Sequence, residues 1–236
     1  MRNYIILNDK NSNEITGLLI STLPPISKPK IRTTIEEIDG RDGDIVTKLG
    51  YGAYDKELQI GLYGDFDINE VISYFDSEGT IVFSNEPDKY YNYEIFEQID
   101  FEKLIRFKTA QVKMHVQPFK YSSVESTRTF NITNETEISI TNNGNYFSKP
   151  VITITGTGTI NLNINGYQVL VIDLSESNEV AIDTENMEAY NPTTKSLMNR
   201  QITGDYNDLN LKVGTNTISW SGTITEISIE NYSRWL

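Results

Sequence analysis

The chain contains no cysteine among its 236 residues. This absence excludes disulfide frameworks, thiolate nucleophiles and cysteine-ligated metals. The single histidine excludes a metal centre built from several imidazoles. No apolar run approaches the roughly 20 residues that a membrane-spanning helix requires, and the N-terminus lacks the apolar core of a signal peptide. We therefore expect assembly in a cytoplasm, without a membrane partner.

Basic charge is also scarce. Lys and Arg number 20 against 33 Asp and Glu, which gives a formal net charge of −13. Both halves of the chain are acidic and neither carries a basic tail, so the overall field repels a phosphate backbone. We expect no specific binding of nucleic acid.

Alternating and β-branched runs dominate the first half of the chain. Pro24, Pro25 and Pro29 interrupt them with an extended loop. The segment Asp39–Asp44 contains two Asp-Gly pairs, which are turn signals, and predicts a hairpin. The runs predicted as strands are Tyr4 to Leu7, Gly17 to Thr22, Arg32 to Ile38, Ile45 to Leu49, Leu58 to Tyr63, Thr80 to Phe83, Tyr90 to Phe96 and Leu104 to Val116.

One segment of this half has helical periodicity. Ile68, Val71, Ile72 and Phe75 follow the spacing of one helix face. Asp67 is a suitable N-cap, Glu70 stands where a capping box places a carboxylate, and Gly79 can end the helix. The pattern predicts one helix near residues 67–78 and no other.

The amino-acid composition becomes rich in Ser and Thr after Pro118–Tyr121. We place a domain boundary there, between residues 1–121 and 122–236. The second half alternates almost throughout, with turn signals about every ten residues, which is typical of an antiparallel sandwich. Asn165-Gly166 is a strong two-residue hairpin turn. The strands predicted there are Val151 to Thr155, Ile160 to Ile164, Val169 to Leu174, Glu179 to Ile182, Thr217 to Trp220 and Glu226 to Ile229.

Chemical motifs are few. His115 lies on an alternating strand and faces away from Met114 and Val116, toward solvent or a neighbouring molecule. Three carboxylates, those of Asp39, Asp42 and Asp44, could bind a cation irregularly, but both calcium-loop registers fail and a hairpin turn explains them better. No Gly-rich phosphate loop or Gly-x-Ser-x-Gly elbow occurs. We expect no enzyme: no catalytic, cofactor-binding or metal-binding residue, and no cofactor.

Aromatic side chains raise the alternative of a sugar-stacking platform. We interpret Trp220, on an alternating strand, as a core residue, and Trp235 as an anchor of the last strand. The other candidates for such a platform are Tyr146, Phe147, Tyr167, Tyr190, Tyr206 and Tyr232.

Three stretches together resemble a known family. The first is the turn at 39–44 followed by the strand at 58–63. The second runs from the predicted helix through Ser84–Tyr91 and Arg106-Phe107 to Val116–Tyr121. The third is the distal half, from Thr141-Asn142-Asn143-Gly144 through Leu211–Ile218 to Ser233-Arg234-Trp235-Leu236. In order and spacing they resemble the distal tail proteins (Dit) of long-tailed siphophages that infect Gram-positive hosts.

The resemblance implies a mainly β protein: an N-terminal β domain with one α-helix, and a C-terminal galectin-like antiparallel β-sandwich. It implies a structural protein of the virion, at the phage tail tip, whose N-terminal domains form a hexameric ring. That homo-hexamer would join the tail tube to the baseplate and host-recognition apparatus. The implied partners are the tail tube protein, the tape-measure protein, the tail-associated lysin and a receptor-binding protein.

Two other functions stay open. A carbohydrate-binding or receptor-binding module would use its second domain to recognise host cell-wall glycan. A tail fibre would favour trimers over hexamers.

Overall fold

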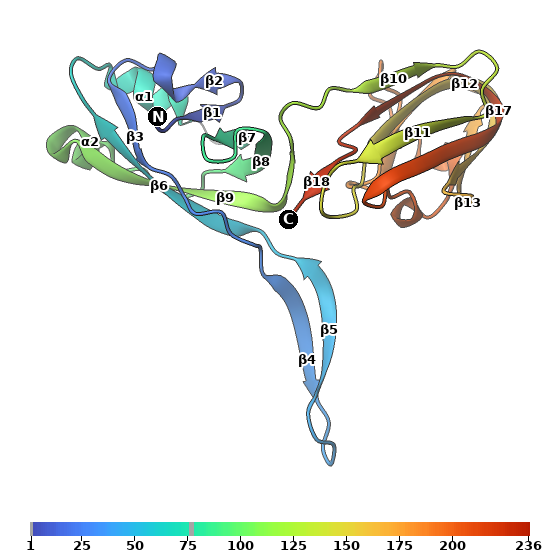
Figure 1. The fold of residues 1–236 in the computed structure, drawn as a ribbon, viewed down its shortest axis with the longest axis horizontal. Coiled ribbons are helices and arrows are strands. Elements are labelled where there is room, and N and C mark those ends of the chain that lie inside the picture. The colour runs from blue at the N-terminus through green and yellow to red at the C-terminus, as the bar shows by residue number, and fades with distance from the viewer. Residues whose placement is uncertain (1, 76–77) are drawn as a thin grey trace. The chain divides into compact units, whose positions relative to one another are not determined.

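The computed structural model describes residues 2–75 and 78–236 of the chain. They divide into two units, one that runs to Ser123 and includes Leu236, and one that spans Val124–Trp235. Strands dominate both units, and the sheets are antiparallel (Figure 1). The protein is mainly β, as the sequence predicts. No helix among the described residues is long and apolar enough to cross a bilayer.

The first unit is built on one sheet whose strands follow the order β2-β1-β7-β8-β9-β6-β3. Inward-facing residues alternate along its longest strands: Leu58 and Ile60 of β6 pair with Val112 and Ala110 of β9, and all four are buried. The strands are β1 (Ile5–Leu7), β2 (Lys10–Asn11), β3 (Leu18–Thr22), β6 (Tyr54–Leu62), β7 (Glu78–Phe83), β8 (Lys89–Glu94) and β9 (Thr109–Ser122). A 3-10 turn, η1 (Ser12–Glu14), follows β2.

The predicted helix is present as α1 (Ile68–Tyr74), which is shorter than the expected 67–78. Asp67 caps it as expected by accepting a bond from the amide of Asn69 at 2.9 Å. Val71 and Phe75, which the spacing places on one helix face, are buried, but Ile72 of the same set is 43% exposed. Gly79 belongs to β7 and not to the helix end. Residues 76 and 77 lie outside the described part of the chain.

A second helix, α2 (Phe101–Phe107), corrects the prediction that no other helix exists and that a strand begins at Leu104. Asp100 accepts a bond from the amide of Lys103 at 2.8 Å and caps the helix. Leu104 is fully buried, and Lys108 ends the helix in the left-handed conformation at φ +58°. The alternating pattern that predicts the strand holds only from Thr109 onward.

The second unit is one antiparallel sheet that folds into two layers around a single core. Two long strands, β12 (Val151–Ile164) and β17 (Gly214–Glu230), pass through both layers. The first half of β12 pairs with β14 and its second half with β13, while β17 pairs with β10 and β11 at its two ends. The shorter strands of this sheet are β10 (Arg128–Asn131), β11 (Glu137–Asn142), β13 (Tyr167–Leu174), β14 (Glu179–Asp183), β15 (Glu188–Tyr190) and β16 (Ile202–Gly204). The two-residue strand β18 (Arg234–Trp235) is not part of it. Two 3-10 turns are η2 (Asn199–Gln201) and η3 (Tyr206–Asp208).

Each long strand replaces two predicted short ones. The register between β12 and β17 shifts near Gly156, where the sequence predicts that a strand ends. Gly222, at φ +105°, lies at the corresponding bend of β17. β-Bulges and glycines let one strand turn between layers without ending. The predicted turn Asn165-Gly166 is confirmed: both residues have positive φ and connect β12 to β13.

Candidate interaction site: the arm and its root

The hairpin of β4 (Ile31–Glu37) and β5 (Asp44–Tyr51), which we call the arm, pairs with no other described strand (Figure 1). Alternating β-branched residues favour its strands, and Gly40 and Gly43 supply positive φ in its turn. The hairpin predicted at Asp39–Asp44 is therefore confirmed. A two-stranded hairpin alone is marginally stable in water. We therefore expect another surface to pack against the arm and stabilise it.

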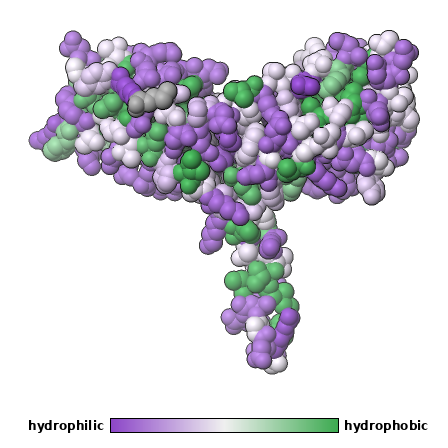
Figure 2. Space-filling view, viewed as in Figure 1, coloured by the Kyte–Doolittle hydropathy of each residue, from purple (hydrophilic) through white to green (hydrophobic). Residues whose placement is uncertain are grey.

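Apolar side chains on the arm are exposed. Ile35 and Val46 lie directly opposite each other, so their side chains share one face, and they are 58% and 55% exposed. Ile38 and Leu49 are also exposed. Figure 2 shows apolar surface along the hairpin and hydrophilic surface at its tip. Exposed apolar residues on an unprotected two-stranded ribbon are typical of an interaction surface.

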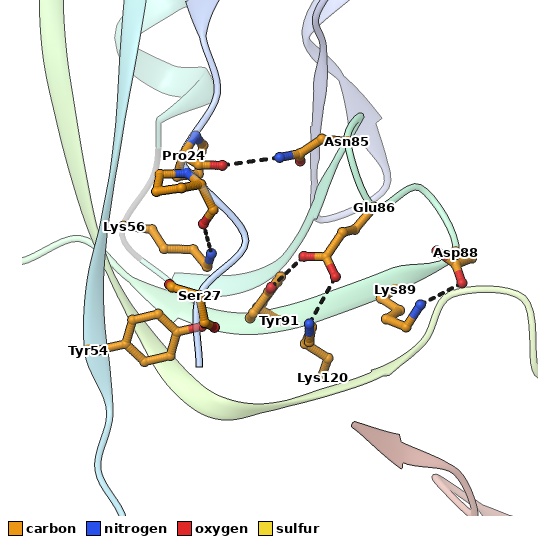
Figure 3. A network of polar contacts seen from close by, with 11 residues as sticks. Pro24, Ser27, Tyr54, Lys56, Asn85, Glu86, Asp88, Lys89, Tyr91 and Lys120 are labelled. Carbon is orange, nitrogen blue, oxygen red and sulfur yellow. Dashed lines mark hydrogen bonds and ion pairs between the residues drawn. The ribbon is translucent and has the colours of Figure 1, made fainter. Parts of the chain in front are cut away.

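The loop at 23–30, which we call the root, connects β3 to the arm. Its prolines lack amide hydrogens and prevent a regular ladder, so its carbonyl oxygens need donors from elsewhere. Three side chains outside the root supply them: the Nδ2 of Asn85 bonds to the oxygen of Pro24 (3.1 Å), the Nζ of Lys56 to that of Pro25 (2.9 Å), and the hydroxyl of Tyr54 to that of Ser27 (3.3 Å) (Figure 3).

Lys56 is the central donor. It occupies an inward position of β6, in phase with Leu58, and is only 4% exposed. Burial lowers the pKa of its amine to about 8, although the carboxylate of Glu86 opposes this effect. The Nζ also lies 4.9 Å from the centroid of the Tyr91 ring, a cation–π distance. The amine is therefore shielded from solvent and holds the root through the carbonyl oxygen of Pro25.

Glu86 connects the residues around Lys56 to the strand β9. Its carboxylate lies 2.9 Å from the Nζ of Lys120 and accepts a 2.7 Å bond from the hydroxyl of Tyr91 (Figure 3). Burial and the neighbouring carboxylate raise the pKa of the Tyr91 hydroxyl, which remains a donor. Because these polar groups are partnered within the unit, the arrangement is suited to positioning the root, and through it the arm.

The other sequence-predicted candidates are dispersed. His115 lies on β9 with Met114 and Val116 fully buried on the opposite face, as predicted, and its Nδ1 is 2.9 Å from Asp55. No cluster of three metal-ligating side chains occurs among the residues that the structure describes, and Asp39, Asp42 and Asp44 lie exposed around the arm's turn.

The aromatic candidates are divided between core and surface. Trp220 is buried in the core of the second unit, which confirms its predicted place, and Tyr232 is buried with it. Tyr206 packs against the same core, whereas Tyr167 is 74% exposed. Phe147 lies against Tyr146, with their centroids 4.6 Å apart.

Comparison with solved structures relates the whole chain to one known architecture. No family model and no curated protein matches the sequence significantly. The crystal structure of SPP1 Dit, presented as a paradigm of the hub adsorption apparatus in Gram-positive infecting phages, matches with a TM-score of 0.63 over 100% of both chains at 15% identity. The chain has the fold of SPP1 Dit. A chain of the phage P2 baseplate, in its activated conformation with Ca, matches with a TM-score of 0.51 at 12% identity, over 100% of this chain and 98% of that one.

Within this Dit-like fold, sequence reasoning missed the root and its donors. A signal for them exists: Lys56 shares the inward phase of Leu58 and Ile60 on an alternating strand, a position where a lysine needs a partner. The partners themselves, Glu86 and the carbonyl of Pro25, cannot be identified without the strand order.

Proposed function

We propose that the protein is a structural component of a phage tail: the distal hub, in which six copies form a ring that joins the tail tube to the baseplate and host-recognition apparatus. The observation that carries this proposal is the match to SPP1 Dit along the full length of both chains. A likeness that covers both units favours the same general architecture and not merely a shared small domain.

The arm supports the self-association that a ring requires. It carries exposed apolar side chains on a hairpin without a covering strand among the described residues. A contact between this hairpin and a different surface of the next copy is a head-to-tail interface, and such an interface generates a ring when the rotation between copies closes. In this proposal the segment 1–121 forms the ring, and 122–236 is a galectin-like sandwich outside it.

The proposed role is mechanical and non-enzymatic. The neighbours of the ring would be the tail tube protein, the tape-measure protein, the tail-associated lysin and a receptor-binding protein, and the site of action would be the tail tip of a virion assembled in the host cytoplasm. A glycan-recognition role has less support, because Trp220 and Tyr232, two of the candidate stacking residues, lie in the core.

Native mass spectrometry and electron microscopy of the purified full chain test the proposal. We expect a species of six times the chain mass of 26.9 kDa, with sixfold rings in projection. A variant without the arm, with residues 32–50 replaced by a short Gly-Ser linker, should remain folded but lose the ring. A trimer, or a monomer at every concentration tested, would contradict the ring. Antibody labelling along the tube instead of at the tip of the virion would contradict the location.

A further inference from the structure

The tip of the arm is strongly acidic. Residues 36–44 include a single basic residue, Arg41, and every residue among them is exposed. The carboxylates of this stretch belong to Glu36, Glu37, Asp39, Asp42 and Asp44. No ion pair among the described residues involves any of them. The arm therefore combines exposed apolar side chains with unpaired negative charge.

The end of α2 has the opposite character. Ile105 and Phe107 are 43% and 64% exposed, and they alternate with Arg106 and Lys108. We call these four residues the α2 patch. Leu104 is fully buried and fixes the helix beneath them.

The charges of the α2 patch are free to meet a partner. Within residues 2–75 and 78–236, neither Arg106 nor Lys108 forms an ion pair. Their cationic groups lie only over neighbouring rings, Arg106 over Phe107 at 5.9 Å and Lys108 over Phe66 at 4.2 Å. Glu102, one turn earlier on α2, is the nearest acidic residue along the helix.

A hollow lies at the start of α2, where Phe101 lines it. It has a volume of about 470 Å³ and is lined mainly by apolar residues, including Ile72 and Phe75 near α1 and Ile99 before α2. Its one acidic lining residue, Glu97, lies 2.6 Å from the Nζ of Lys113, which also pairs with Asp55 at 3.0 Å. Apolar surface is thus available at the start of the helix that carries the α2 patch.

We propose that the arm of one copy docks on the α2 patch of the next copy. The inference rests on the proposed ring and names the surface through which it closes. Copies with a net charge of −13 repel one another, so a contact between them needs local charges of opposite sign. The acidic tip of the arm and the basic α2 patch supply such charges, each next to exposed apolar side chains.

A second basic group, at the foot of the arm, fits less well. The Nη2 of Arg32 already donates to the carbonyl of Leu49 at 3.3 Å, and the Nζ of Lys28 lies 5.8 Å from the centroid of the Tyr51 ring. Arg32 is thus engaged by a hydrogen bond within the arm, whereas among the described residues the side chains of Arg106 and Lys108 donate no hydrogen bond and lie over aromatic rings.

Disulfide crosslinking tests the contact directly, because the chain has no cysteine of its own. The pair Ile35→Cys and Phe107→Cys should form a ladder of linked chains up to the closed ring under mild oxidation, and reduction should reverse it. The control pair, Ile35→Cys with Val213→Cys, uses a site of the second unit that is 56% exposed. Rings that form normally but crosslink no better than this control would overturn the docking and leave the hub intact. Failure of the unmodified chain to form rings would instead contradict the hub itself.

Charge exchange provides an independent test. Glu36→Lys with Glu37→Lys, or Arg106→Glu with Lys108→Glu, should each raise the concentration needed for half-assembly about tenfold or more. The quadruple variant should recover most of this loss, because every interface regains opposite charges. Assembly of the quadruple variant that is no better than that of either double variant would overturn the proposal. Circular dichroism checks that each variant is folded.

Discussion

The Oε1 of Glu86 lies 2.9 Å from the Nζ of Lys120, and both side chains are nearly shielded from solvent. Removing one partner of a buried ion pair leaves the other charge uncompensated. Glu86→Gln should therefore lower the free energy of unfolding in urea by about 3 kcal/mol. Asp88→Asn is the matched control, because Asp88, paired with Lys89, is 58% exposed and its loss should cost less than about 1 kcal/mol. Equal losses in the two variants would contradict this account.

Lys56 should make stability depend on pH. Its pKa is about 8 in the folded chain, below its ordinary value of 10.5, so above pH 8 the unfolded chain binds more protons and stability rises with pH. Between pH 7 and 9.5 the unfolding free energy of the natural chain should rise by about 2 kcal/mol relative to that of Lys56→Met. The tyrosines are common to both proteins, so their contribution largely cancels in this difference; burial raises the pKa values of Tyr54 and Tyr91, which lie near Lys56. Parallel pH profiles for the two proteins would refute the assignment.

Trp220 and Tyr167 are a buried and an exposed aromatic residue of the second unit, and their replacement should have different costs. Trp220 is 6% exposed, and replacing it with alanine should cost about 3 to 5 kcal/mol of unfolding free energy. Tyr167, which is 74% exposed, should tolerate the same replacement within about 0.5 kcal/mol. Thermal unfolding followed by tyrosine and tryptophan fluorescence measures both. A small loss for Trp220→Ala would place that ring outside the core.

Gly222 should be required for the bend of β17. A Cβ there would lie 2.5 Å from the carbonyl oxygen of Thr159, on a backbone with φ +105°. Gly222→Ala should therefore destabilise the second unit by about 3 kcal/mol. Gly158 also has positive φ, but a Cβ at that residue would have no other atom within 4 Å, so Gly158→Ala should cost about 1 kcal/mol. A reversed order of the two losses, measured in urea, would disprove the role of the bend.

The differences between expectation and structure have identifiable causes. The sequence pattern does not reveal α2 because the apolar residues of this helix run directly into the alternating residues of β9. The N-cap Asp100 is a single-residue signal, whereas the alternation of β9 extends over many residues. The long strands β12 and β17 are divided in the sequence pattern by glycines, which end strands in some contexts and bend them in others. Neighbouring strands decide between these outcomes, as the register shift beside Gly156 shows.

The sequence by itself determined the features that depend on neighbouring residues: the alternation that makes the chain mainly β, the helix begun by Asp67, and the turn at Asn165-Gly166. Tertiary structure alone decided which distant groups meet. Glu86 and Lys120 are 34 residues apart, and only the strand order brings them together. The tertiary structure also leaves Ile35 and Val46 exposed, because no other described strand covers the arm. Alternation assigns side chains to the faces of a strand, but whether another layer covers a face depends on contacts that no local pattern encodes.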